Sequence, residues 1–181
     1  MGAWDQDKYI KAWNYASLVH RAQLLPASDI PYINHIGLVA MEAMAAIEQS
    51  DNIDRPDLLV ACALLHDTIE DTEATFADIE RLFGKDVAGG VMALSKDKNL
   101  GSKELQMLDS LQRIKREPNE IWMVKLADRI TNLQPPPKHW DKNKIAKYKR
   151  EAIVILQALG EANAFLAQRL EQKIEAYAQY E

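Results

Sequence analysis

The sequence predicts an all-α fold, organised as a single-domain helical bundle of residues 1–181. Apolar residues recur three and four positions apart, as at Phe165, Leu166, Leu170 and Ile174, which is the spacing of one helix face. The alternating apolar and polar pattern of strands is nearly absent. No repeat or convincing linker divides the chain, and a chain of this length can bury one sizeable core.

Proline and glycine mark the ends of the helices expected in the first half of the chain. Residues 26–31 form a loop with proline at both ends, and Pro56 fits the first turn of an apolar helix. Gly84 stops a short helix, and Gly89-Gly90 interrupts the next one. The expected helices span residues 4–25, 35–49, 55 to the His-Asp pair at 66–67, 75–83 and 86–95.

The second half begins with a polar, lysine-bearing loop at 96–102 and is helical beyond it. Pro118 closes the first of these helices, and the run 135–137 of three prolines ends the second sharply. Gly160 separates the last two. The expected helices span residues 102–116, 120–133, 142–159 and 162–180.

Composition excludes several classes of function. The formal net charge of −5 argues against general binding to nucleic acid or to an anionic membrane, although a local cation cluster can still hold a small phosphorylated ligand. The apolar runs are too short to span a membrane, and the N-terminal residues do not read as a signal peptide. The single cysteine, Cys62, lies in an apolar run, so we expect no disulfide framework and a cytoplasmic location.

The segment from His66 to Asp71 carries the most informative chemistry. It follows an apolar run and presents two doublets, His66-Asp67 and Glu70-Asp71, four residues apart. If the helix continues, position 66 shares a face with position 70, and position 67 with position 71. Imidazole nitrogen and carboxylate oxygen both bind transition metals. Acids crowded at a helix end are unfavourable, because the last carbonyl groups carry partial negative charge, and a divalent cation would compensate them. Solvation of Glu70 and Asp71 is the alternative explanation.

Two further segments supply the same kinds of ligand. His35 begins a helix after Tyr32-Ile33-Asn34, and Asp128 lies in the apolar stretch 124–133. An aspartate in such a stretch is costly to bury unpaired, and a metal ion or the neighbouring Arg129 could satisfy it. Taken singly, the histidine fits an ordinary hydrogen-bonded role and the aspartate an ordinary salt bridge.

Together these segments resemble the HD-domain superfamily of metal-dependent phosphohydrolases. The resemblance is closer to one branch, the hydrolase domain of the RelA/SpoT proteins and the small stand-alone alarmone hydrolases. It is carried by Tyr-Ile-Asn-His at 32–35, His-Asp-Thr-Ile-Glu-Asp at 66–71, Lys-Asp-Lys at 96–98 and Lys-Leu-Ala-Asp-Arg with Asn-Leu within 125–133. These motifs cover about residues 16–133, and the helices in 141–180 lie outside them.

The resemblance implies an HD-type bundle that hydrolyses a small phosphorylated nucleotide, most specifically guanosine 3′,5′-bis(diphosphate) at its 3′-pyrophosphate. It assigns one divalent metal, usually Mn²⁺, to four ligands, and Glu70 and Asp71 to activation of the attacking water. The implied metal ligands are His35, His66, Asp67 and Asp128. The basic and amide side chains that we expect near the substrate are Arg21, Lys98, Lys125, Arg129 and Asn132, with Lys96 as a further candidate.

One departure bears on the substrate. Relatives in this branch usually carry an Arg-Lys pair that packs against guanine, whereas residues 23–31 contain no basic residue. Two alternatives therefore stay open: a phosphohydrolase for another nucleotide or small phosphate ester, and a binding module that retains the metal without catalysis.

The C-terminal helices, 142–159 and 162–180, have an apolar stripe that most simply covers the core. A homo-oligomer contact through that stripe is the alternative. The lysine-rich stretch 142–149 reads first as a solvated face, and second as the rim of a phosphate site.

Overall fold

The computed structural model describes residues 4–51 and 53–181. Within these residues the regular structure is helical apart from one isolated bridge between Leu24 and Pro31, which confirms the predicted all-α class. The first helices are α1 (Gln6–Val19), α2 (Ile33–Glu48), α3 (Pro56–Leu65), the single turn α4 (Thr68–Asp71) and α5 (Phe76–Phe83). The later helices are α6 (Lys85–Leu94), α7 (Lys103–Ile114), α8 (Asn119–Asn132), α9 (Lys142–Leu159) and α10 (Ala164–Tyr177), with 3-10 turns η1 (Gly160–Ala162) and η2 (Ala178–Tyr180).

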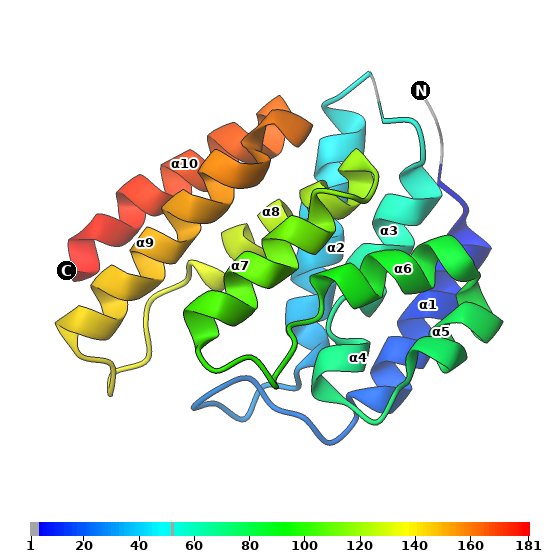
Figure 1. Ribbon diagram of the computed structural model, residues 1–181, viewed down its shortest axis with the longest axis horizontal. Coiled ribbons are helices and arrows are strands. Elements are labelled where there is room, and N and C mark those ends of the chain that lie inside the picture. Colours follow the sequence, from blue (N-terminus) through cyan, green and yellow to red (C-terminus); the bar gives the residue numbers. More distant parts are fainter. Residues whose placement is uncertain (1–3, 52) are drawn as a thin grey trace.

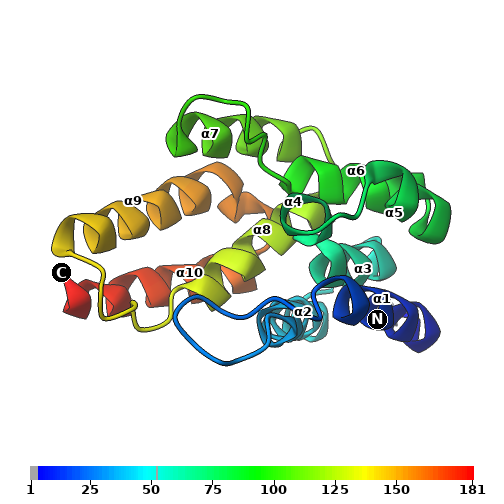
Figure 2. The same ribbon diagram turned by 90° about the horizontal axis from the view of Figure 1, so that it is seen from below.

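Helix α8 lies at the centre of the arrangement. It packs against α2, α3, α9 and α10, while α1 and α5 lie at one end of the molecule and α9 and α10 run side by side at the other (Figures 1 and 2). Most residues of α8 are buried, and these include its charged residues Glu120, Lys125, Asp128 and Arg129. Any polar group on this helix therefore needs a partner inside the protein.

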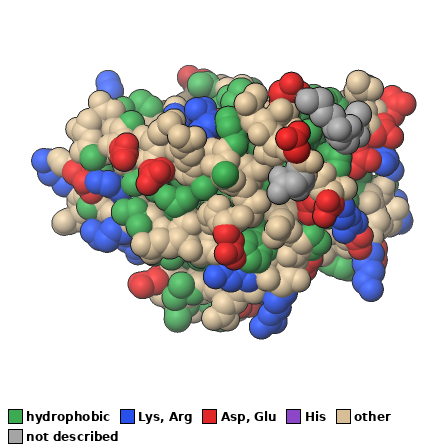
Figure 3. Space-filling model, turned by 90° about the horizontal axis from the view of Figure 1, so that it is seen from above, with side chains coloured by type: hydrophobic (Ala, Val, Ile, Leu, Met, Phe, Trp, Pro, Cys, Tyr) green, Lys and Arg blue, Asp and Glu red, His purple; other side chains and the backbone are tan. Residues whose placement is uncertain are grey.

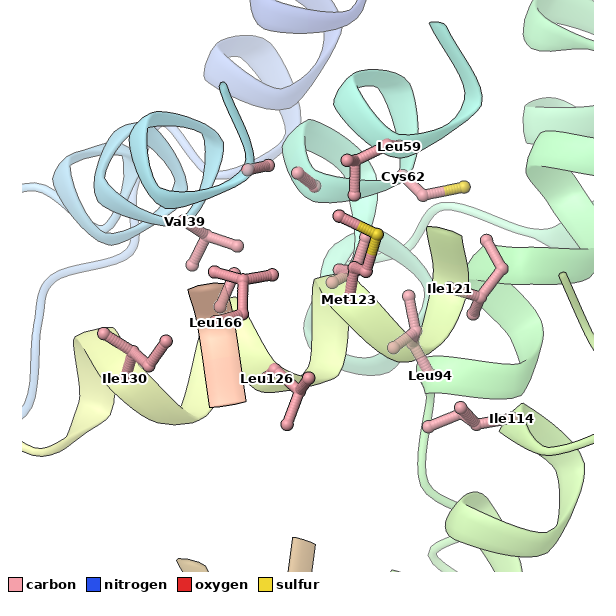
Figure 4. Packing of buried hydrophobic residues seen from close by; sticks show 14 of the residues in the cluster. Val39, Leu59, Cys62, Leu94, Ile114, Ile121, Met123, Leu126, Ile130 and Leu166 are labelled. Atoms are coloured by element: carbon pink, nitrogen blue, oxygen red, sulfur yellow. The ribbon is translucent and has the colours of Figure 1, made fainter. Parts of the chain in front are cut away.

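The core continues from one end of the molecule to the other. Met123, Leu126 and Ile130 of α8 face buried side chains from the surrounding helices, among them Val39 of α2 and Leu166 of α10 (Figure 4). The C-terminal helices thus cover the core, as their apolar stripe predicted. One face of the surface carries interspersed acidic, basic and hydrophobic side chains (Figure 3). Among the described residues, no helix combines the length and the apolar character needed to cross a bilayer.

A partly buried ion pair joins α10 to α2. The side chain of Glu42 on α2 is only 3% exposed, and both of its carboxylate oxygens accept hydrogen bonds from the guanidinium group of Arg169 on α10. Bidentate pairs of this kind add geometric specificity to a contact between helices. The C-terminal segment, which lies outside the predicted motifs, therefore helps to fix the helix that carries His35.

Three expectations about helix limits were wrong. The first helix ends at Val19 rather than at residue 25, because the chain folds back there: Tyr32 N–H donates to Gln23 and Leu25 N–H donates to Ile30. Gly89-Gly90 does not interrupt α6, which runs through both glycines. The helix before the His-Asp pair stops at Leu65, and α4 starts afresh at Thr68, so positions 66 and 70 do not share a continuous helix.

Candidate metal and hydrolytic site

Three parts of the chain that are distant in sequence bring the predicted metal ligands together. His35 lies in the first turn of α2, His66 and Asp67 lie in the turn between α3 and α4, and Asp128 lies on α8. These elements meet because α2, α3 and α8 pack on one another. At the break after Leu65, the hydroxyl group of Thr68 donates to the Leu65 carbonyl and satisfies an acceptor at the helix end.

The donor atoms of these residues face a common point. The Nε2 atoms of His35 and His66 are 3.3 Å apart, and Asp128 Oδ1 lies 3.4 and 4.0 Å from them, respectively. Asp67 Oδ2 lies 2.9 Å from His66 Nε2 and 3.6 Å from His35 Nε2. His35, His66 and Asp128 are buried, and the side chain of Asp67 is 18% exposed. The fold thus assembles two imidazole nitrogens and two carboxylate oxygens, which is the group that the sequence predicted.

Neighbouring groups orient both imidazole rings. His66 Nδ1–H donates to the carbonyl oxygen of Ala63 at 2.8 Å, which directs Nε2 at the cluster. His35 Nδ1 lies 3.4 Å from the hydroxyl oxygen of Thr131, and that hydroxyl group donates to the backbone oxygen of Asp128. The Thr131 oxygen is then free to accept from His35, so both Nε2 atoms can act as ligands.

The carboxylates are held as well. Tyr32 donates its hydroxyl hydrogen to Asp67 Oδ2 at 2.5 Å, and burial together with Asp67 raises the pKa of Tyr32, which keeps it a donor. Lys125 donates to Asp128 Oδ2 at 2.9 Å, and the side-chain amide of Asn132 donates to Asp128 Oδ1. Lys125 and Asn132, predicted near the substrate, are therefore engaged with a predicted metal ligand.

The electrostatics of the cluster fit a divalent cation. Burial opposes the charged form of His66, but Asp67 and Asp128 outweigh it and raise its pKa to about 9. Burial also opposes ionisation of Asp128, yet Lys125 and the histidines hold its pKa well below the usual range. The cluster therefore attracts positive charge, which a proton or a cation can provide. His35, His66 and Asp128 can bind one divalent metal ion, and Asp67 lies within reach of the same point.

The second doublet lies beside a lysine-bearing loop. Glu70 Oε2 accepts the backbone N–H of Lys96 at 2.8 Å, and its Oε1 accepts the ammonium group of the same residue at 3.2 Å. Lys98 Nζ lies 3.6 Å from Asp71 Oδ1 and donates to the Glu70 carbonyl. Burial, followed by Asp67 and Glu70, raises the pKa of Asp71, which suits a group that carries a proton.

A hollow of about 520 Å³ opens beside Glu70. Its charged lining is mixed, with the basic residues Lys96, Lys98 and Arg113 and the acidic residues Glu70, Asp97 and Asp109. A larger cavity of about 940 Å³ lies between α1, α3 and α6, where none of the predicted site residues lies.

The two other basic residues predicted near the substrate differ in exposure: Arg129 is buried and Arg21 is exposed. Arg129 is buried, with its guanidinium carbon 4.5 Å from the ring centre of Tyr148 and its Nη2 3.7 Å from Glu151 Oε2. Its Nε and Nη1 have no hydrogen-bond partner among the described residues. Arg21 is exposed and donates to the Leu18 carbonyl at the end of α1, so no described contact joins it to the cluster.

Three residues near the cluster had no role in the sequence-based prediction. Tyr32 and Thr131 orient ligands, and His20, only 2% exposed, places its ring 5.2 Å from that of Tyr32. Tyr32 lies in the same short motif as His35, which was a usable signal. His20 and Thr131 had none, because their positions depend on the fold-back after α1 and on the packing of α8 against α2.

Known proteins resemble this chain over almost its whole length. The HD domain family model matches residues 12–164. A guanosine-3′,5′-bis(diphosphate) 3′-pyrophosphohydrolase MESH1 from Drosophila melanogaster is 30% identical over 177 residues, covering 95% of this chain and 96% of that protein. The corresponding MESH1 from Danio rerio is 32% identical over 168 residues, covering 88% of each.

A solved structure also resembles this chain over almost its whole length. A metazoan ortholog of SpoT, described as hydrolysing ppGpp and acting in starvation responses, superposes with a TM-score of 0.83 at 28% identity, covering 97% of this chain and 98% of that one. The predicted enzyme class, a hydrolase, is confirmed by these relatives. With its family match and its paired His and His-Asp motifs, the chain belongs to the HD-domain family.

Proposed function

We propose that this HD-domain protein hydrolyses guanosine 3′,5′-bis(diphosphate), cleaving the 3′-pyrophosphate and leaving GDP. The observation that carries the proposal is the buried cluster of His35, His66, Asp67 and Asp128 beside Glu70 and Asp71, in a chain that aligns end to end with hydrolases of that nucleotide. The predicted cytoplasmic location and the predicted absence of nucleic-acid or membrane partners accord with a small nucleotide substrate and stay predictions.

We propose that the four residues of the cluster bind one divalent ion, with Mn²⁺ as the expected metal. Two nitrogen and two oxygen donors suit Mn²⁺ and its neighbours among the transition metals, and they leave positions on a six-coordinate ion for water and substrate. When bound, such an ion polarises a phosphoryl oxygen and acidifies water. The protein contributes orientation, since Tyr32, Lys125 and Asn132 hold the carboxylates in place.

Glu70 is the residue to which we assign handling of the attacking water. Its carboxylate is held by Lys96, and it follows the His-Asp pair by one short turn. It would orient the water and accept its proton, while Asp71, whose pKa is raised, would carry a proton to the ribose 3′-oxygen as the bond to pyrophosphate breaks. We assign contact with substrate phosphates to Lys98, whose side chain is 64% exposed, and to Nε and Nη1 of Arg129, which are buried and have no partner among the described residues. A substrate contact by Arg21 stays a prediction.

The test is release of pyrophosphate from guanosine 3′,5′-bis(diphosphate) by the purified full chain with Mn²⁺. We expect Glu70→Gln to lower kcat by about 10²–10⁴-fold, because a positioned general base typically contributes that much. Glu80→Gln, an exposed substitution on α5, is the matched control and should leave kcat unchanged. Metal content would be measured on each variant. Metal-loaded wild-type protein that releases no more pyrophosphate than Glu70→Gln would refute the substrate assignment.

A second candidate is hydrolysis of another nucleotide or a small phosphate ester. It is favoured by the fold-back loop at 20–32, where the side chains of Leu24 and Ile30 are 50% and 46% exposed in place of the cations that commonly stack on guanine in this branch. A panel of nucleoside mono-, di- and 3′-pyrophosphates separates the candidates. A preference for a base other than guanine would identify the second.

A further inference from the structure

The peptide unit between Ser95 and Lys96 is bound on both of its sides. Its N–H donates to Glu70 Oε2 at 2.8 Å, and its carbonyl oxygen accepts Nη2 of Arg113 at 2.7 Å. Arg113 lies on α7, and Glu70 lies on α4. The two side chains therefore contact opposite ends of one rigid group.

Arg113 also fixes the end of the helix that leads to this peptide unit. Its Nη1 donates to the carbonyl oxygens of Met92 and Ala93, and Ser110, one turn earlier on α7, donates to Ala93 O at 2.9 Å. These carbonyl groups belong to the last turn of α6, which has no basic residue of its own there. A guanidinium group at a helix C-terminus satisfies free carbonyls and complements their partial negative charge.

We propose that Arg113 is a positioning residue for Glu70 and that it acts through the Ser95–Lys96 peptide unit. Because the peptide bond is planar, holding its carbonyl oxygen fixes the direction of its N–H. A charged donor on the carbonyl also polarises the amide and strengthens the hydrogen bond that the N–H gives. Lys96 contributes its ammonium group to the same carboxylate, so an error in the path of the backbone would displace both contacts of Glu70.

This inference rests on the proposed role of Glu70 and is tested by steady-state kinetics with guanosine 3′,5′-bis(diphosphate) and Mn²⁺. Arg113→Ala should lower kcat by about 10- to 100-fold, the scale of a displacement of about 1 Å at a reacting group, with KM and bound metal within about twofold of wild type. Arg113→Lys keeps one charged donor and should restore part of kcat. Arg116→Ala, an exposed arginine on the turn after α7, is the matched control and should behave as wild type.

A double-mutant cycle shows whether the effect passes through Glu70. In the Glu70→Gln background, Arg113→Ala should change kcat by less than about twofold, since coupled residues are not additive. An equal loss in both backgrounds, or no loss in the single variant, would overturn the inference. If Arg113→Ala does not fold, Arg113→Lys takes its place in the cycle. Full activity of Glu70→Gln would instead refute the proposed role of Glu70, so the two failures are distinguishable.

Discussion

The hydroxyl group of Tyr32 illustrates how single atoms set the geometry of the metal cluster. It donates to Asp67 Oδ2, the oxygen that also lies near both histidine Nε2 atoms. Removing that donor leaves the carboxylate free to rotate, and the loss of a partner that orients a ligand typically costs 10- to 100-fold in metal affinity. We therefore expect Tyr32→Phe to raise the Kd for Mn²⁺ by about 10- to 100-fold, as measured by competition with a chelator.

The matched control for this experiment is Tyr15→Phe. Tyr15 lies on α1 with its ring 5.5 Å from Phe83 and has no hydroxyl contact with the cluster. Its substitution should leave the Kd unchanged. Equal affinity in Tyr32→Phe and wild type would mean that Asp67 is oriented by other contacts or does not bind the metal.

At this scale the sequence predicted which residues form the cluster, but it did not predict which side chains contact them. His35, His66 and Asp128 were recognisable because metal ligands must be particular residues in a particular order. Tyr32 lies 35 positions from Asp67 in sequence, and Lys125 looked like a phosphate ligand until α8 proved to be buried on all sides. A buried lysine must pair internally, and Asp128 one turn later is its partner.

At the scale of elements, α6 shows why two adjacent glycines have different roles. A Cβ atom at Gly90 would lie 2.4 Å from Cδ1 of Ile121 and 2.9 Å from Sγ of Cys62, whereas one at Gly89 would meet nothing closer than 3.9 Å. Gly90 thus lets α6 approach α3 and α8 closely, and Gly89 is free to change.

We expect Gly90→Ala to lower the free energy of unfolding by about 1–3 kcal/mol, the usual cost of overpacking a core. Gly89→Ala, its matched control, should raise that free energy by up to about 1 kcal/mol, because alanine loses less backbone entropy in a helix. Urea denaturation measures both. A Gly90→Ala variant as stable as Gly89→Ala would show that Ile121 and Cys62 can move aside without cost.

Helix limits followed from sequence at some of the positions that proline or glycine marked and failed where side chains set them. Gly84 ends α5 as expected, whereas α7 ends at Ile114, before the Pro118 that was expected to close it. At the break after Leu65 the hydroxyl group of Thr68 donates to the Leu65 carbonyl, a contact that periodicity does not reveal. The break matters for function, because it lets adjacent residues His66 and Asp67 turn their donor atoms to one point, 2.9 Å apart.

For the whole molecule, the cluster joins three helices that also pack on one another. His35 comes from α2, the His-Asp turn from the end of α3, and Asp128 from α8, while Arg169 of α10 fastens α2 from the far side through Glu42. An ion bound by these ligands would bind the folded chain much more tightly than the unfolded one, because the ligands are far apart in sequence. Metal affinity should therefore appear as folding stability.

We expect saturating Mn²⁺ to stabilise the protein by about 2.7 kcal/mol when free metal is 100 times Kd, and a chelator to remove that gain. Thermal unfolding at matched protein concentration measures it as a rise in Tm. His35→Ala removes one ligand and should abolish most of the Mn²⁺-dependent rise, whereas His139→Ala, an exposed histidine before α9, should keep it. The same rise in His35→Ala as in wild type would locate the stabilising ion away from the cluster. Because His66 must lose its proton to bind metal and has a pKa raised to about 9, the Kd should fall as the pH rises, and at one fixed Mn²⁺ concentration the rise in Tm should be larger at pH 8 than at pH 6.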